Sequence, residues 1–170
     1  ITNAWCGDLY CIDTLFIFMA NMVWNSTMNT SEVCKMLNDK GEDGQYKILF
    51  LVVCDVFYLE MMAFADLLLL DIIYLEWHDC MFMLDRPISE FDGPVDSVRV
   101  PVLPVSGDCK PFQEVLIELA SRLRFPAFTR PDGARKFRDY PDFIVNFETE
   151  PGSGIGYLAG WRGADGSKFM

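Results

Sequence analysis

Five acidic residues interrupt the most apolar stretch of the chain: Asp55, Glu60, Asp66, Asp71 and Glu76. Their spacing of five or six residues fits neither one helix face nor strand alternation, so we interpret most of them as ends of elements. Asp55 differs, because it directly follows the apolar run ILFLVVC at residues 48–54. Open α/β sheets bind ligands at the carboxyl ends of their strands. A carboxylate at Asp55 could therefore accept paired hydrogen bonds from a nucleotide base or a ribose.

The cysteines and the histidine do not form a recognisable metal or nucleophile motif. No two of the six cysteines are spaced C-x-x-C, and His78 is the only histidine. This pattern argues against a zinc site built by the chain alone. We interpret the cysteines as buried free thiols, as at Cys54 within its apolar run. His78 and Cys80 would still need an acid held beside them to act as a nucleophilic pair.

Two other motifs have simple structural interpretations. Asp85 and Arg86 precede Pro87 and could form a local ion pair, or Arg86 could face a ligand. The letters GSGIGYLA at residues 152–159 contain G-x-G-x-x-A, the pattern of a dinucleotide phosphate loop. Because Pro151 precedes it and GWRGADG follows, we expect no helix to begin there, and we interpret the segment as an ordinary loop or an inter-domain contact.

Composition limits the functional classes. The chain has 170 residues, of which 51% are hydrophobic, and a formal net charge of -11. That length and apolar content predict one folded domain, or one and a half. The acidic balance excludes a protein that binds nucleic acid through its phosphates, and it disfavours an anionic membrane surface. Polar or acidic residues interrupt both of the long apolar stretches, at residues 14–31 and 48–75, so we expect no direct membrane insertion.

The elements around Asp55 follow strand–helix alternation. Apolar runs predict strands at residues 14–20, 48–54 and 67–70. Periodic residues predict helices at 31–38, capped by Thr30 or Ser31, and at 57–66. This βαβαβ order predicts an α/β fold with a partial Rossmann-like parallel sheet over residues 1–84.

The second half, residues 85–170, has a different character. Five prolines between residues 85 and 111 predict an irregular crossing segment. A helix follows at residues 112–124, then a short helix within 137–149 and a glycine-rich tail.

Several blocks resemble the molybdopterin oxidoreductases, the dimethyl sulfoxide reductase family. The resemblance is carried by VVCDVFYLEMMAFADLLLLDIIYLE at residues 52–76, FMANMVWNS at 18–26 and the segment at 78–104. The helix at 112–124 and the run FRDYPDFIVNFETEPGSGIGYLAGWRG are similar to one branch, the sulfite dehydrogenase and polysulfide or thiosulfate reductase catalytic subunits. Together these blocks cover nearly the whole chain.

The resemblance implies an internal fragment of a large catalytic subunit that is inactive alone. The parent enzyme would hold molybdenum on two pterin guanine dinucleotides and carry an iron–sulfur cluster that this chain does not bind. Asp55 matches the acid that binds one guanine, Asn21 the asparagine of a neighbouring cofactor loop, and Arg86 an arginine of the cofactor region. The implied partners are a membrane-anchor subunit together with an iron–sulfur electron-transfer subunit. The implied location is cytoplasmic, with membrane attachment through those subunits.

The chain also departs from the family pattern. The family prefers Thr or Ser where this chain has Leu59 and Met62, and Pro at Leu70. A decayed copy would explain such changes. A fragment of a formate dehydrogenase or nitrate reductase subunit, or a non-catalytic α/β interaction domain, stays an alternative.

Overall fold

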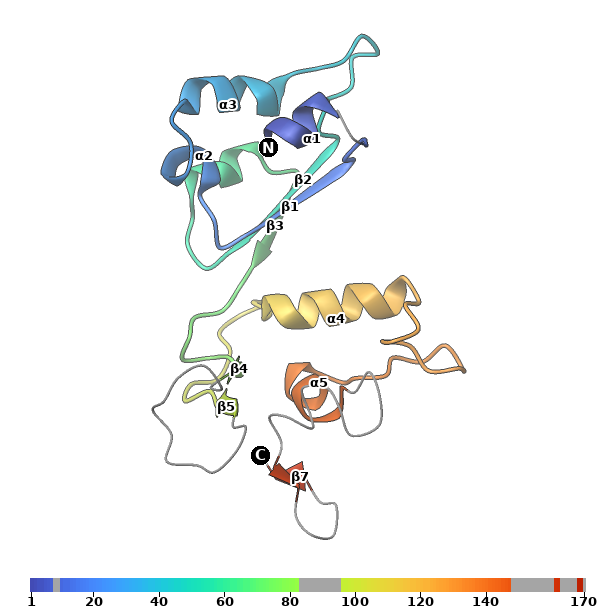
Figure 1. Cartoon of the computed structure of the whole chain (residues 1–170). Helices are drawn as coiled ribbons and strands as arrows, with labels where there is room; N and C mark the ends of the chain where they lie inside the picture. The colour runs from blue at the N-terminus through green and yellow to red at the C-terminus, as the bar shows by residue number, and fades with distance from the viewer. Residues whose placement is uncertain (8–9, 83–95, 148–160, 163–167, 170) are drawn as a thin grey trace. The chain divides into compact units, whose positions relative to one another are not determined.

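The computed structural model describes residues 1–7, 10–82, 96–147, 161–162 and 168–169 (Figure 1). Its contacts divide the chain into two compact units. Unit 1 comprises Ile1–Ile72 with Gly107–Lys110, and unit 2 comprises Ile73–Ser106 with Pro111–Met170. The domain boundary predicted after residue 84 falls outside the described residues.

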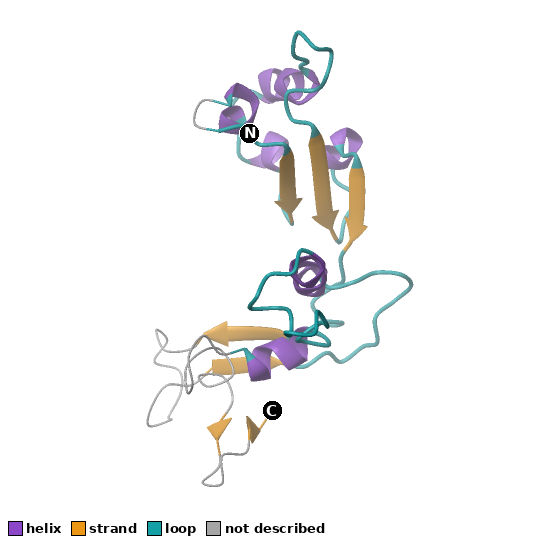
Figure 2. Ribbon diagram, turned by 90° about the vertical axis from the view of Figure 1, so that its right-hand side faces the viewer, coloured by secondary structure: helices purple, strands orange, loops and turns teal. Residues whose placement is uncertain are grey.

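A three-stranded parallel sheet organises unit 1. Its strands are β1 (Thr14–Phe18), β2 (Phe50–Asp55) and β3 (Leu67–Leu70), in the order β1-β2-β3. The arrows of these strands point the same way in Figure 2. β2 is central, and all its residues after Phe50 are buried, as expected of a continuous apolar strand between two neighbours. The α/β prediction with a parallel sheet is confirmed.

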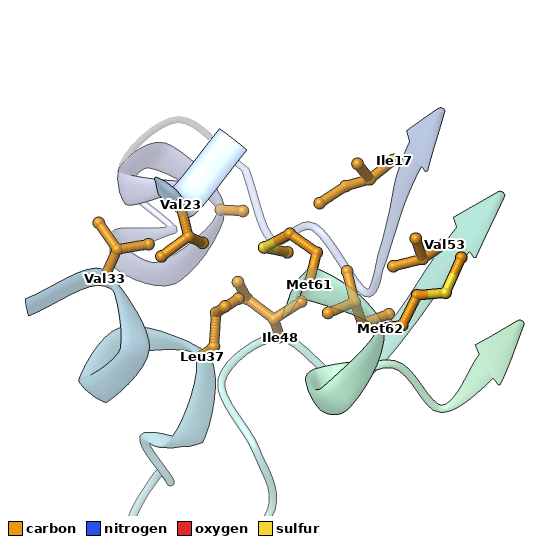
Figure 3. Close-up of a cluster of buried hydrophobic side chains, with 10 residues drawn as sticks. Ile17, Val23, Val33, Leu37, Ile48, Val53, Met61 and Met62 are labelled. Atoms are coloured by element: carbon orange, nitrogen blue, oxygen red, sulfur yellow. The ribbon is translucent and has the colours of Figure 1, made fainter. Parts of the chain in front are cut away.

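Helices supply the rest of the core of unit 1. They are α1 (Thr2–Cys6), α2 (Met22–Asn25), α3 (Thr30–Asn38) and the 3₁₀ helix η1 (Glu60–Phe64). Figure 3 shows helix side chains such as Val23, Leu37 and Met61 gathered in one cluster with Ile17 and Val53 of the sheet. Burying such side chains contributes about 1.5–3 kcal/mol each, which is the main force that holds these short elements together.

The cap of α3 differs from the prediction. Neither Thr30 nor Ser31 is the N-cap; Asn29 is, and its side chain accepts a hydrogen bond of 3.2 Å from the backbone N–H of Glu32. Thr30 instead donates its hydroxyl to the carbonyl of Val23. Both asparagine and threonine are good capping residues. Because the Thr30 hydroxyl is bonded to Val23 of α2, Asn29 is the residue that caps α3.

The helix predicted at residues 57–66 is wrong in length and in type. Only Glu60–Phe64 is helical, and Phe57 is 70% exposed rather than on a core face. The β2–β3 connection is too tightly held for a longer helix. Asp66 donates its N–H to the carbonyl of Leu51 at 2.9 Å, and its carboxylate accepts the N–H of Leu51 at 2.8 Å.

Unit 2 contains an antiparallel pair, two helices and a short second pair. The strands are β4 (Asp79–Phe82) with β5 (Asp96–Arg99), and β6 (Trp161–Arg162) with β7 (Lys168–Phe169). The helices α4 (Phe112–Arg122) and α5 (Tyr140–Asn146) confirm the predictions for 112–124 and 137–149 with shorter bounds. β5 lies where an irregular segment was predicted. Its sequence DSVR has no apolar alternation, so pairing with β4 had to come from tertiary structure.

The described helices are all too short to cross a lipid bilayer as an apolar span.

Candidate functional site

Three chain segments leave the sheet of unit 1 at the carboxyl ends of β1, β2 and β3. Backbone hydrogen bonds hold them side by side. The N–H of Met19 donates to the carbonyl of Cys54 at 3.0 Å, and the N–H of Asp71 donates to the carbonyl of Asp55 at 3.3 Å. This edge brings together polar groups that are far apart in sequence, and it is the position where parallel α/β sheets bind ligands.

Asp55 lies at this edge as the last residue of β2 and is only 5% exposed. Its Oδ1 accepts the backbone N–H of Phe57 at 3.0 Å, an Asx turn that fixes the carboxylate as the chain leaves the strand. Within the described part of the chain, Oδ2 makes no hydrogen bond. Asp55 therefore offers one oriented acceptor oxygen at the end of the central strand.

Asn21 follows β1 and is the N-cap of α2. Its backbone carbonyl accepts the N–H groups of Trp24 and Asn25, and its side-chain Nδ2 donates to Oε2 of Glu60 at 2.6 Å. Its Oδ1 is buried and has no hydrogen-bond partner among the residues that the structure describes. An orphaned buried acceptor costs about 1–3 kcal/mol, so this amide is held in place by its other contacts.

Glu60 is the residue of this edge that sequence reasoning missed. It was interpreted as the end of an element, and it does begin η1, but its carboxylate also holds Asn21. The structure thus joins Asn21 to Glu60 and places Asp55 at the end of the neighbouring strand. Its position in the sequence could have indicated this role. Glu60 comes five residues after β2 and Asn21 three residues after β1, so both follow the carboxyl ends of neighbouring parallel strands.

A second buried carboxylate lies beside Asp55. Asp71, directly after β3, is 4% exposed, and its Oδ1 accepts the N–H of Ile72 at 2.8 Å. Together with burial, the charges of Asp71 and Asp55 raise the pKa of the Cys54 thiol to about 12. Cys54 therefore stays protonated at neutral pH, and a protonated thiol is neither a nucleophile nor a metal ligand.

The prediction that the cysteines are buried free thiols is confirmed only in part. Cys54 is buried and free as predicted, but Cys6 and Cys11 are exposed. Among the residues that the structure describes, no three or more His, Cys, Asp and Glu side chains are grouped closely enough to hold a metal ion.

The remaining sequence candidates lie elsewhere. Arg86 and the G-x-G-x-x-A segment fall outside the described residues. His78 is half-buried just before β4. Its neighbour Asp79 forms an ion pair of 3.3 Å with Arg99 across the β4–β5 pair, as the register of the two strands requires.

Comparison with known proteins gives one informative match. The chain is 72% identical over 170 residues to a sulfite dehydrogenase subunit of Allochromatium vinosum. The match covers the whole of this chain and 18% of the relative's length. No protein-family profile matches the chain. No solved structure matches it either.

Proposed function

We propose that this chain is part of the catalytic subunit of an oxidoreductase that acts on an inorganic sulfur compound, with sulfite as the first candidate. The observation that carries the proposal is the 72% identity, along the entire chain, to a sulfite dehydrogenase subunit. Similarity at that level over the whole chain favours a shared role for this segment. Because the segment corresponds to 18% of the relative, the reaction would need the rest of the subunit.

Within such a subunit, the carboxyl edge of the parallel sheet would hold the guanine end of a molybdenum–pterin guanine dinucleotide. The residues present fit that group. Asp55 offers Oδ2 as an acceptor, and Asn21 offers a buried Oδ1 that no donor of the described residues reaches. A guanine edge carries N–H donors that such oxygens recognise. When bound, the cofactor would supply two-electron redox chemistry, while these side chains bind and orient it.

The relative is named as one subunit of its enzyme, which indicates a multi-subunit assembly for that protein. For this chain we propose partners of the same kind: an iron–sulfur electron-transfer subunit, and a membrane anchor that would attach the enzyme to the membrane. Phe57, Tyr58 and Leu70 are exposed apolar side chains of unit 1, and covering them in such an assembly would remove apolar surface from water.

The test uses the full-length subunit that contains this segment. The subunit would be assayed for sulfite oxidation with an artificial electron acceptor, and its molybdenum and releasable guanine nucleotide would be measured. We expect Asp55→Ala to lower both contents at least about 10-fold, the loss typical of removing one hydrogen bond to a charged group.

Asp13→Ala is the matched control. Asp13 is an exposed aspartate that immediately precedes β1, at the opposite end of the strands from Asp55. It should leave both contents unchanged. Full molybdenum and guanine content in Asp55→Ala would contradict the role of Asp55, and absence of sulfite oxidation by the unmodified subunit would contradict the substrate.

A further inference from the structure

Positive charge is concentrated in one segment of this acidic chain. Residues 122–138 contain six of the 14 Lys and Arg residues but only one acid, Asp132. Five of these cations lie in the loop that connects α4 to α5. A basic loop in a chain of net charge -11 is not explained by solubility, because the acidic residues already supply a high net charge and acids favour solubility more than bases do.

Three of the cations surround a hollow in unit 2. The hollow measures about 920 Å³, and Arg124, Arg130 and Lys136 line it together with backbone and side chains of the loop. All three are exposed, and none forms an ion pair with a carboxylate in the described part of the chain. Lys136 Nζ also lies 5.2 Å from the centroid of the Phe137 ring, a contact that does not neutralise its charge, so all three charges are available to a ligand.

The acid in the same lining does not neutralise them. Asp142 Oδ2 accepts the N–H of Arg138 at 2.9 Å, and its Oδ1 accepts Nδ2 of Asn146 at 2.7 Å. Burial raises the pKa of Asp142, but these hydrogen bonds and the charge of Arg138 outweigh it and hold the pKa below the usual value. Asp142 is thus an ionised carboxylate that already has its own cation.

The loop that carries the cations is held in a defined shape. An antiparallel bridge joins Thr129 to Arg135, and Gly133 closes the turn at φ +84° with its N–H on the carbonyl of Arg130. The ring of Phe128 packs against those of Phe137 and Phe143, with ring centroids 5.9 and 5.8 Å apart, which fastens the loop to α5. A preorganised set of charges binds with less loss of side-chain and loop entropy.

Arg124 adds evidence of a constrained position. It has φ +58° just after α4, a left-handed conformation that costs a non-glycine residue roughly 1 kcal/mol. Glycine is the common residue at such a helix end. A glycine would remove the strain, but it would also remove one of the three cations of the hollow.

We propose that this hollow is a binding site for a doubly charged oxyanion of the phosphate or sulfate type, with Arg124, Arg130 and Lys136 as its ligands. Guanidinium and ammonium groups are the usual recognition groups for such anions. The anion is either a free inorganic ion or the diphosphate of a nucleotide, which share the same chemistry. This proposal does not depend on the function proposed for the sheet edge in unit 1.

Isothermal titration of the 170-residue chain at low ionic strength tests the site. The titrants are inorganic sulfate, inorganic phosphate, pyrophosphate and ADP. We expect saturable binding of at least one of them, weakened by added NaCl because the contacts are exposed. Tighter binding of ADP than of pyrophosphate would assign the site to a nucleotide, and equal or tighter binding of the inorganic ions would assign it to a free anion.

Charge-removing variants separate the site from general attraction. Arg130→Gln and Lys136→Gln should each weaken binding about 5-fold, the loss of one charge-assisted hydrogen bond. Arg130→Lys, which keeps the charge, should retain most of the affinity and shows that the loop still folds. The control is Arg122→Gln, because Arg122 already pairs with Glu118 at 2.6 Å and does not line the hollow. No binding of any of the four titrants, or an equal loss in Arg122→Gln, would overturn the proposal.

Discussion

Single residues carry most of what is specific about the sheet edge. The placement of Asp55 could be predicted, because an apolar run followed by an acid fixes where a buried strand ends. The link between Asn21 and Glu60 could not, since it joins two side chains 39 positions apart through a turn that no local pattern describes. Local patterns specify elements, whereas contacts between elements depend on the packing of the whole unit.

The Cys54 thiol gives a pH prediction. Its pKa is raised from 9.0 to about 12 by burial and by two neighbouring carboxylates, so the folded state favours the protonated form. That contribution to stability is fully present below pH 9 and is lost as the pH rises toward 12. Between these values the free energy of unfolding should fall by up to about 1.4 kcal/mol per pH unit.

Urea unfolding of the wild type and of Cys54→Ala between about pH 7 and pH 10.5 measures this dependence. The alanine variant should be less stable at neutral pH because it leaves a small cavity, but its stability should decline less with pH. Cys6→Ala, at an exposed thiol, serves as the control. Parallel pH curves for the wild type and Cys54→Ala would show that the thiol does not titrate in this range.

At the scale of elements, apolar runs identified the three strands of unit 1, and helical spacing identified α4, but not every end of these elements. The strands β4 and β5 of unit 2 were not predicted. The four leucines of β3 were recognised as a strand because they are too few for a stable helix. The prediction of a helix at residues 57–66 was wrong because two aspartates bind backbone N–H groups on either side of η1. Asp55 accepts the N–H of Phe57, and Asp66 accepts the N–H of Leu51 in β2. A side chain that binds backbone in this way overrides helical periodicity.

The cap of α3 provides the test at this scale. Replacing Asn29 by Ala removes the acceptor for the Glu32 N–H, so the chain should lose about 1 kcal/mol of stability. Ser31→Ala is the matched control, because the side chain of Ser31 is exposed and makes no hydrogen bond in the described part of the chain. Thermal unfolding followed by circular dichroism compares the two variants. An equal loss in both would mean that residue 31 contributes to the cap after all.

At the scale of the whole molecule, exposed apolar side chains occur in both units. Phe57 and Leu70 in unit 1 and Val102 and Phe125 in unit 2 are each more than half exposed. In unit 2, Leu116 and Leu119 of α4 and Leu123, which directly follows the helix, line an apolar groove of about 380 Å³ with Phe125. The exposure of these leucines could not be predicted from the sequence, because leucines at helical spacing predict a buried helix face.

We therefore expect the isolated chain to bind the dye ANS and to self-associate at micromolar concentration. The double variant Leu119→Gln with Leu123→Gln should reduce both effects, since it removes much of the apolar groove. Lys35→Gln, at an exposed position on α3, is the control. Light scattering after size exclusion gives the association state. A monomer that does not bind ANS would indicate that these side chains need no cover.

The strand order of unit 1 has a consequence for the way the chain reaches its fold. Thr14 of β1 pairs with Phe50, 36 residues later, whereas Val52 of β2 pairs with Leu67, only 15 residues later. Closing the longer loop costs roughly 0.8 kcal/mol more in chain entropy. During synthesis β1 leaves the ribosome well before β2, its partner, exists. The first of these three strands to be made is thus expected to be the last of them to dock, an order that pulse-labelled hydrogen exchange during refolding would reveal as later protection of β1 than of β3.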